Sequence, residues 1–381
     1  MAVDPRQVVA GFLTLSMFVM LGNMIKHDHF SPVTEEMGLK ATGARSNTMK
    51  LDNNAEMNSV DMAGVEDLMD TIEEVKPCWT KPSPKNQPSN GFVTFSLTMG
   101  PEYHISQITD AVVVARYLGA TFVLPDIRGN ELGNKRKFQD MYNVDKFVRS
   151  LDGVVEVIDE IPDEVSAKKP AVIRVPNRVT ESFIMDTIQP IFKKNKYLRL
   201  AVIFSSVSLR PKETSNKDLD ATACLAMFSG LELKHEYSEV ARKMLDRLQE
   251  LSKKSDGKVL AIDLRTDLLE KKSCKTTSGA RRKGCYNPDE DDIMPAENKG
   301  EFLKSSNADL ASALDLEICS QSDVFIPAVA GLFYGHVTGK RIASGRTQII
   351  VPSQSSTSTH ASDFTSTYIS NKNHLAYTCY C

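Results

Sequence analysis

From residue 91 onward, short runs rich in β-branched and aromatic residues alternate with segments whose apolar residues recur every three or four positions. The first pattern is typical of strands and the second of amphipathic helices. The expected strands are residues 92–97, 121–124, 154–158, 171–175, 198–204, 258–264, 323–327 and 348–351. Strands that alternate with helices usually pair in parallel beneath a layer of helices. The sequence therefore predicts an α/β protein built from Rossmann-like layers.

Two helices are the clearest. Their apolar positions, in chain order, are Ile105, Ile108, Val112, Ala115 and Leu118, then Val240, Met244, Leu248 and Leu251. Residues 99–104 are expected to form the loop before the first helix. The polar stretch 212–220 is the expected boundary between two lobes, residues 90–215 and 216–381.

An uncharged stretch, residues 7–25, lies between Arg6 and Lys26. It nearly spans a bilayer core of about 30 Å as a helix. A cleaved signal peptide is the alternative, but its apolar region is usually shorter. We expect an uncleaved signal anchor of type II, with residues 1–6 as a cytoplasmic tail and the remainder in the secretory lumen. Residues 26–89 have the polar composition of a disordered stem that ends in a Pro-rich linker.

The overall composition narrows the range of partners. With 41% hydrophobic residues and a net charge of −3, the chain lacks the basic excess of an electrostatic nucleic-acid binder. None of the seven cysteines forms a C-x-x-C pair, which argues against zinc and thioredoxin-type sites. Cys274 and Cys285 bracket a basic loop, where a local disulfide is plausible. The odd number of cysteines leaves at least one thiol unpaired within a monomer.

Ligands of open parallel sheets bind at the carboxyl ends of the strands, and three places in the sequence meet this rule. The first is the segment 100–104, where Glu102 has the chemistry of a general base and His104 also titrates. The alternatives are a carboxylate that only complements the helix N-terminus and a histidine satisfied within the loop.

The second and third places follow later strands. Asp263 and Arg265 end the apolar run 259–262, and an Arg side chain suits forked recognition of a diphosphate. A surface salt bridge is the alternative there. Ser322 and Asp323 begin the third run, which leads to a Gly-containing turn that would suit a nucleotide or ribose.

Three other patterns were compared with known functional motifs, and none meets the requirements of its motif. Residues 335–341 resemble a P-loop but are one residue short and lack Ser or Thr after the Lys. The acidic run 289–291 resembles a metal site but is better explained as a solvated loop. No Gly-x-Gly-x-x-Gly follows an expected strand, which weakens a dehydrogenase interpretation.

Several blocks together resemble the plant O-fucosyltransferase superfamily, and most of all its MANNAN SYNTHESIS-RELATED proteins. The blocks are GFVTFSLTMGPEYHISQITDAVVVARYLGATFVLPDIR at 91–128, AIDLR at 261–265, SQSDVFIPAVAGLF at 320–333, KPCW at 76–79, CLAMF at 224–228 and NKNHLAY at 371–377. The resemblance covers nearly the whole chain.

The resemblance implies a GT-B-like architecture of two Rossmann-like lobes, and an inverting, metal-independent glycosyltransferase of the Golgi membrane with no cofactor. Its donor would be a nucleotide sugar, GDP-linked ahead of UDP-linked, and its acceptor a mannan or another cell-wall polysaccharide. The alternative is a non-catalytic partner or folding factor of a Golgi mannan synthase. The implied residues are Glu102 and His104 for catalysis, and Arg265, Asp263, Ser322 and Asp323 for the donor.

The chain departs from the family pattern in three ways. Asp263 stands where a His is usual, and Glu102 where an Asn is usual. After Asn287 one βα unit of about 30–40 residues is expected to be absent, which would shorten the donor-binding lobe.

Overall fold

The computed structural model describes the chain in nine ranges, all within the compact unit Asp61–Cys381. They are residues 75–84, 88–128, 135–203, 209–211, 216–263, 297, 308–327, 330–352 and 364–381. None of the helices in these ranges has the length and apolar character needed to cross a membrane. The predicted anchor at 7–25 and most of the predicted stem lie outside them.

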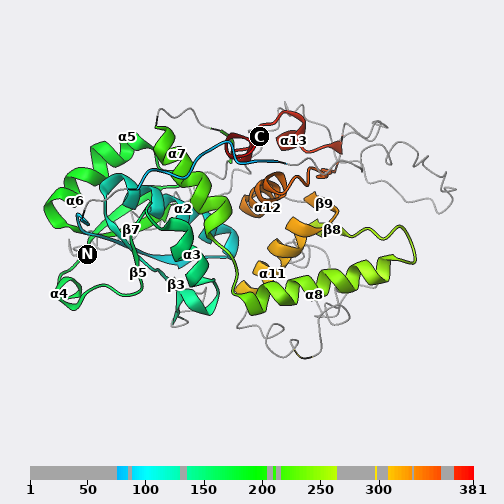
Figure 1. Cartoon of the computed structure of the whole chain (residues 1–381), viewed down its shortest axis with the longest axis horizontal. Coiled ribbons are helices and arrows are strands. Elements are labelled where there is room, and N and C mark those ends of the chain that lie inside the picture. The colour runs from blue at the N-terminus through cyan, green and yellow to red at the C-terminus, as the bar shows by residue number, and fades with distance from the viewer. Residues whose placement is uncertain are drawn as a thin grey trace, which may run out of the picture. The chain divides into compact units, whose positions relative to one another are not determined.

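A seven-stranded sheet organises the first half of the described chain (Figure 1). Its main path runs β5-β2-β1-β7-β6, and every neighbouring pair on this path is parallel. Beyond β2, β3 pairs in parallel with the end of β1, and β4 pairs antiparallel with β3. The strands are β1 (Phe92–Thr98), β2 (Thr121–Val123), β3 (Asp126–Arg128), β4 (Lys135–Arg136), β5 (Val157–Ile158), β6 (Ala171–Pro176) and β7 (Tyr197–Ile203). The predicted parallel α/β sheet is confirmed.

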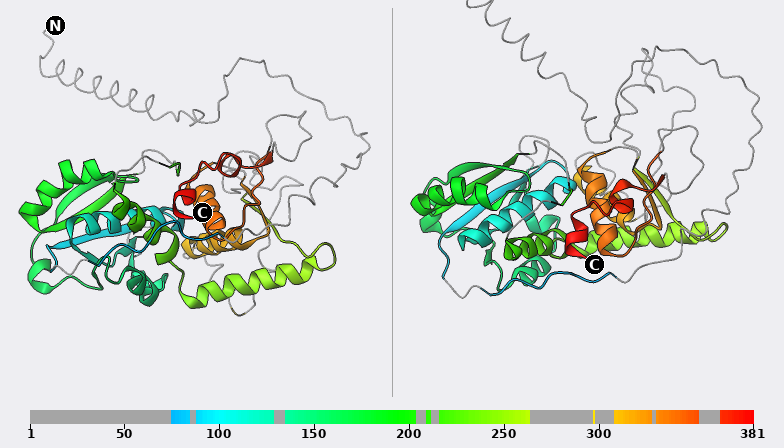
Figure 2. Two further views of the ribbon diagram at one scale, coloured as in Figure 1. Left: turned by 45° about the horizontal axis from the view of Figure 1, so that its top comes forward. Right: turned by 90° about the horizontal axis from the view of Figure 1, so that it is seen from above.

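The helices that connect these strands cover one face of the sheet. Each step from β1 to β2, from β2 to β5 and from β6 to β7 moves in the same direction, so right-handed crossovers place their helices on the same side. Val93, Phe95 and Leu97 of β1 point into this core. The helices are α2 (Pro101–Leu118), α3 (Val144–Leu151), α5 (Glu181–Phe183), the π-helix η4 (Ile184–Ile188) and α6 (Gln189–Asn195). Figure 2 shows these layers from two further directions.

A second, smaller sheet pairs β8 (Leu260–Asp263) with β9 (Val324–Pro327) in parallel. It is accompanied by α8 (His235–Ser252), α11 (Ala308–Gln321) and α12 (Leu332–Ala343). Ala261 is buried on one face of β8, whereas Leu260 and Ile262 on the other face are 52% and 45% exposed. Parallel strands are normally covered on both faces, but no described helix or strand covers this second face of β8.

The remaining described helices are η3 (Phe138–Asp140), α4 (Asp163–Ser166), α7 (Lys217–Cys224), the π-helix η5 (Leu225–Gly230), α13 (Thr367–Ser370) and α14 (Ala376–Cys379). Of these, α7 and η5 lie between the two sheets in the chain, η3 and α4 lie between strands of the first sheet, and α13 and α14 follow α12. Both α7 and η5 pack against α2, just after the predicted boundary between lobes. The lobe limits themselves stay predictions.

The structure corrects three expectations about strands and the segments that follow them. Residues 99–104 are not all loop, because α2 already begins at Pro101, where the fixed φ of proline suits a first helical position. Residues 348–351 form no regular strand, since only the isolated bridges Phe325↔Ile349 and Ile350↔Thr365 occur there. The expected strand 154–158 shortens to β5, because Val154 and Val155 instead close a turn onto Leu151.

The predicted apolar face of α8 is only half correct. Val240 and Met244 are buried, but Leu251 is 55% exposed. Figure 1 shows the C-terminal part of α8 extending beyond α11, its packing partner. The sequence pattern therefore continues past the part of α8 that packs against α11.

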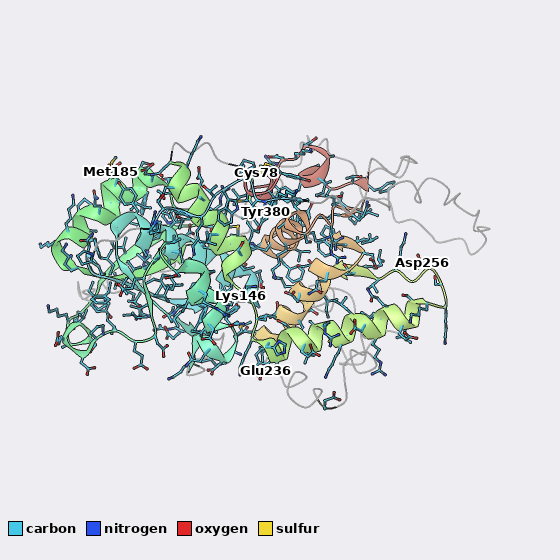
Figure 3. The ribbon with its side chains drawn as sticks, viewed as in Figure 1. Cys78, Lys146, Met185, Glu236, Asp256 and Tyr380 are labelled. Carbon is cyan, nitrogen blue, oxygen red and sulfur yellow. A yellow bond between two sulfur atoms is a disulfide. The ribbon has the colours of Figure 1, made fainter. Side chains whose placement is uncertain are left out.

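Two disulfides fasten the C-terminal segment. Cys78 bonds Cys381, and Cys224 at the end of α7 bonds Cys379 in α14. Backbone hydrogen bonds pair Lys76 with Cys381 in both directions. Cys78 and Tyr380 accordingly lie close together in Figure 3. Cys319 is buried and unpaired, as the odd count required, while Cys274 and Cys285 lie outside the described residues.

Candidate functional site

Glu102 lies in the first turn of α2, directly after the end of the central strand β1. The free N–H groups of a helix N-terminus favour a negative charge at this position. Its carboxylate folds back over Gly100, because a Cβ added at residue 100 would lie 2.4 Å from Glu102 Oε2. Glycine at position 100 therefore leaves the space that the carboxylate occupies.

His104 is fully buried behind Glu102. Its Nε2 lies 3.1 Å from the Met99 carbonyl oxygen and its Nδ1 lies 2.7 Å from Tyr142 Oη. A carbonyl only accepts, so Nε2–H donates to it and Nδ1 accepts from the Tyr142 hydroxyl. Burial lowers the pKa of His104 to about 3, which keeps the imidazole neutral.

This histidine also holds a strained turn. Met99 has a φ of 66°, a left-handed conformation that is uncommon for a residue with a side chain. The hydrogen bond from His104 fixes its carbonyl, and with it the approach to Gly100 and Glu102. The geometry thus gives His104 a positioning role, and its predicted part in catalysis stays a prediction.

An ion pair that the sequence did not reveal lies beside this cluster. Arg136 Nη2 of β4 is 2.6 Å from Asp309 Oδ2 of α11, and the two side chains are 17% and 12% exposed. Burial raises the pKa of the Tyr142 phenol, the charges of Asp309 and Glu102 raise it further, and Arg136 lowers it. The charges of Glu102, Arg136 and Asp309 therefore all influence the pKa of the Tyr142 phenol. Arg136 and Asp309 are 173 residues apart, so no local pattern could have found the pair.

Asp263 is the last residue of β8, paired with Pro327 at the end of β9. It is half-buried at the carboxyl edge of the small sheet, where ligands of parallel sheets bind. Arg265 follows two residues later and lies outside the described residues.

Ser322 and Asp323 lie at the other end of this sheet. Asp323 Oδ2 accepts a 2.8 Å hydrogen bond from the Val259 N–H at the start of β8. Four residues separate Val259 from Asp263, roughly 13 Å along a strand at about 3.3 Å per residue. The structure therefore does not bring Ser322 and Asp323 together with Asp263, and their part in donor binding stays a prediction.

Arg341 explains how the Ser322–Asp323 turn is held. Its buried guanidinium donates to the carbonyl oxygens of Ser322 at 2.6 Å, Asp323 at 2.8 Å and Gln348 at 3.0 Å. Burial lowers the pKa of Arg341 to about 10. The P-loop-like segment that contains it is helix α12, so it has no phosphate-binding loop. Its Gly335 instead permits close packing, because a Cβ there would lie 2.7 Å from Leu209 Cδ1.

One further contact links the two groups of elements. Ser106 Oγ of α2 lies 3.1 Å from His336 Nε2 of α12, and both side chains are buried. Among the described residues, no three His, Cys, Asp or Glu side chains are grouped to hold a metal ion. A cavity of about 320 Å³ lies at the C-terminal end of α2, beside Arg116 and Gly119 and away from Glu102.

Comparison with known proteins identifies relatives along the whole chain. Residues 104–287 match the family model "GDP-fucose protein O-fucosyltransferase". Protein MANNAN SYNTHESIS-RELATED 1 of Arabidopsis thaliana is 44% identical, with 100% of each chain covered. Protein MANNAN SYNTHESIS-RELATED of Trigonella foenum-graecum is 38% identical, again with 100% of each covered. Plant O-fucosyltransferases match at lower identity.

The first of these alignments spans 434 positions for a chain of 381 residues, so about 53 positions of the alignment have no counterpart in this chain. Among solved structures, POFUT1 in complex with GDP is similar at 13% identity and a TM-score of 0.36, over 70% of this chain and 99% of that one. That likeness is too weak to bear on the site. The sequence relatives are sufficient by themselves: the chain belongs to the MANNAN SYNTHESIS-RELATED family of O-fucosyltransferase-like plant proteins.

Proposed function

We propose that this protein is a glycosyltransferase of the Golgi membrane that transfers a sugar from a GDP-sugar to mannan or another cell-wall polysaccharide. The observation that carries the proposal is the match of residues 104–287 to the GDP-fucose protein O-fucosyltransferase model. The full-length similarity to proteins named for mannan synthesis supports the choice of acceptor. The proposed enzyme is inverting and metal-independent, with a type II anchor and two GT-B lobes.

In the proposed reaction Glu102 acts as the general base. The acceptor hydroxyl loses its proton to the carboxylate while its oxygen bonds the anomeric carbon, and the bond from that carbon to the diphosphate breaks. The N-terminus of α2 favours a negative charge at Glu102, and the space left by Gly100 accommodates its carboxylate. His104 maintains the turn that precedes it.

Donor binding is assigned to the carboxyl edge of the small sheet. Arg265, two residues after Asp263 in the sequence, is proposed to bind the diphosphate through paired charge-assisted hydrogen bonds. Asp263 lies at the same edge, where it contacts the sugar or ribose hydroxyls. Ser322 and Asp323 are proposed to act indirectly, by fixing the start of β9 relative to β8.

Calorimetric titration of the full-length protein with GDP, UDP and ADP tests this function. We expect selective GDP binding, and about 30-fold weaker binding for Arg265→Ala, since one lost charge-assisted contact costs about 2 kcal/mol. Arg247→Ala on the exposed part of α8 is the matched control. UDP selectivity would change the donor, and unaltered binding by Arg265→Ala would remove this residue from the site.

A second candidate function is that of a non-catalytic partner of a mannan synthase. Leu260 and Ile262 are exposed on β8, and the alignment with MANNAN SYNTHESIS-RELATED 1 contains about 53 positions without a counterpart here. An open apolar sheet face of this kind suits association with another protein. Restoration of mannan synthesis in deficient cells by Glu102→Ala, at normal protein level, would favour this partner role over catalysis.

A further inference from the structure

Positive charge is concentrated in one short part of the chain. Residues 168–199 contain eight Lys or Arg and two Asp or Glu, a net charge of +6, while the whole chain carries −3. The other residues therefore sum to −9. The eight cations are Lys168, Lys169, Arg174, Arg178, Lys193, Lys194, Lys196 and Arg199.

Six of these eight side chains are exposed. They are Lys168, Lys169, Arg174, Lys193, Lys194 and Lys196. Across the described part of the chain, none of the six forms an ion pair with a carboxylate, in contrast to α8, where Arg242 pairs with Glu239 and Asp246. Lys196 Nζ lies 5.6 Å from the centre of the Phe192 ring. Within the described part of the chain, no carboxylate therefore neutralises these six charges.

The sheet brings these residues to one surface. β6 and β7 are parallel with Ala171 opposite Leu198, so Lys169 and Lys196 lie at equivalent positions two residues before them. Arg199 is opposite Val172, which is 65% exposed, and Arg174 follows on the same face. Lys168, Lys169 and Lys196 form a rim at the amino ends of β6 and β7, and the two arginines lie on the face itself.

The same face carries groups of other kinds. Phe92 is opposite Tyr197 and Thr94 is opposite Arg199, and all four side chains are half-buried. Arg199 Nη2 donates to Ser96 Oγ at 2.8 Å. This surface, the basic face, consists of Phe92, Thr94, Ser96, Val172, Arg174, Tyr197 and Arg199 with the rim lysines 168, 169 and 196. It extends over three strands on the side opposite the helices.

We propose that the basic face binds a carboxylate-bearing polysaccharide. Guanidinium groups pair with carboxylates in a forked geometry, and an anionic chain relieves the repulsion between neighbouring cations. Aromatic rings and hydroxyl groups on the same face provide contacts for sugar rings. A flat surface that spans three strands suits an extended polymer better than a compact ligand. A lipid surface would call for large apolar side chains in the middle of the patch, where Arg174 and Arg199 lie.

Some of these cations, considered one at a time, have simpler structural roles. Arg174 on the edge strand β6 discourages pairing with another sheet, and Lys193 and Lys194 in the last turn of α6 complement the helix dipole. Neither role requires Arg199, Lys168, Lys169 and Lys196 to gather on the same surface.

The test measures binding of the full-length protein, in a neutral detergent, to immobilised polygalacturonate, with neutral galactomannan as the reference. The triple variant Lys169→Ser, Arg174→Ser, Lys196→Ser is compared with the matched control Arg247→Ser, Lys253→Ser, Lys254→Ser, at exposed positions in the last turns of α8 and directly after it. We expect wild-type binding that weakens with added salt, at least a tenfold loss for the first variant, and no change for the second.

Three results would overturn the proposal. They are equal losses in both triple variants, equal binding of wild type to galactomannan, and binding to phosphatidylserine vesicles but not to polygalacturonate. The proposal does not depend on the proposed transferase activity. GDP titration of the same variants should match wild type, so a failure here and a failure of the donor site remain distinguishable.

Discussion

Three histidines, His104, His336 and His374, are almost fully buried, and burial lowers their pKa values to about 3, about 3 and about 4. Each is held by specific partners. His374 Nε2 lies 3.0 Å from the Gly335 carbonyl oxygen, and its Nδ1 accepts from the Ala376 N–H at 2.9 Å. All three imidazoles are therefore neutral near pH 7.

We expect the free energy of unfolding to fall as the pH is lowered from about 6.5 to about 4. The folded-state pKa values lie below that of an exposed imidazole, about 6.5, so the unfolded chain binds more protons in this window. The stability that these groups contribute is complete above pH 6.5 and is lost toward pH 3–4. His336→Gln should reduce the slope by up to about 1.4 kcal/mol per pH unit.

Urea unfolding at several pH values measures this slope. His235→Gln is the matched control, because His235 at the start of α8 is exposed. Identical slopes for His336→Gln and wild type would show that His336 does not titrate on unfolding.

For single residues, the sequence identified candidates for the functional site but not the side chains and backbone groups that surround them. Glu102 and His104 were found because they follow a strand, and the space over Gly100 agrees with a placed carboxylate. The enclosure of His104 depends on Tyr142, 38 residues away, which no local pattern indicates. Arg341 looked like part of a phosphate loop, and only tertiary packing shows that it holds carbonyl groups instead.

Among the elements, β4 and α11 are joined by the Arg136–Asp309 pair. Removing one partner of a buried pair leaves the other charge unneutralised, which usually costs more than removing both. We therefore expect Asp309→Asn alone to destabilise the fold by about 3 kcal/mol. The double variant Arg136→Met, Asp309→Asn should lose less than the sum of the single variants.

A double-mutant cycle by urea unfolding measures this coupling. The exposed pair Lys253–Glu250 is the control, and its disruption should change stability by less than about 1 kcal/mol. Additive losses at Arg136 and Asp309 would mean that the pair contributes nothing as a pair.

Element prediction succeeded where the pattern was long. β1, α2, β6 and β7 each carry several residues of regular periodicity, and their existence is confirmed. β3, β4 and β5 contain only two or three residues, so they are defined by the strand they pair with and not by their own sequence. Ile349 and Ile350 are the opposite case, in which the sequence has a strand-like β-branched run but no regular strand forms. Each of these residues makes only an isolated bridge, because no neighbouring strand continues alongside them.

On the scale of the whole molecule, the disulfides Cys78–Cys381 and Cys224–Cys379 tie distant parts of the chain. Closing a loop of 155 residues stabilises the folded state by up to about 5 kcal/mol if it acts through the entropy of the unfolded chain. We expect Cys224→Ser, Cys379→Ser to lose a large part of this, as measured by urea unfolding. Reductant should lower the stability of wild type more than that of the variant. Equal stabilities of the oxidised proteins would contradict this estimate.

The pairing itself could not be derived from the sequence. Seven cysteines without short-range spacing allow many combinations, and the observed bonds depend on the antiparallel approach of Pro77 and Tyr380. The limits of the two lobes depend in the same way on packing. α7 begins within the polar stretch 212–220 and still packs against α2, which covers the first sheet.

The two cysteines of each disulfide are 303 and 155 residues apart, so they are added to the growing chain at different times. At a synthesis rate of roughly 5–20 residues per second, Cys381 is added about 15–60 s after Cys78. The strands of the first sheet are synthesised within this interval. During that interval the thiol of Cys78 is exposed to earlier partners such as Cys224. Correct closure therefore comes late relative to the synthesis of Cys78, and the yield of native protein should depend on how well the host compartment reshuffles mispaired sulfurs.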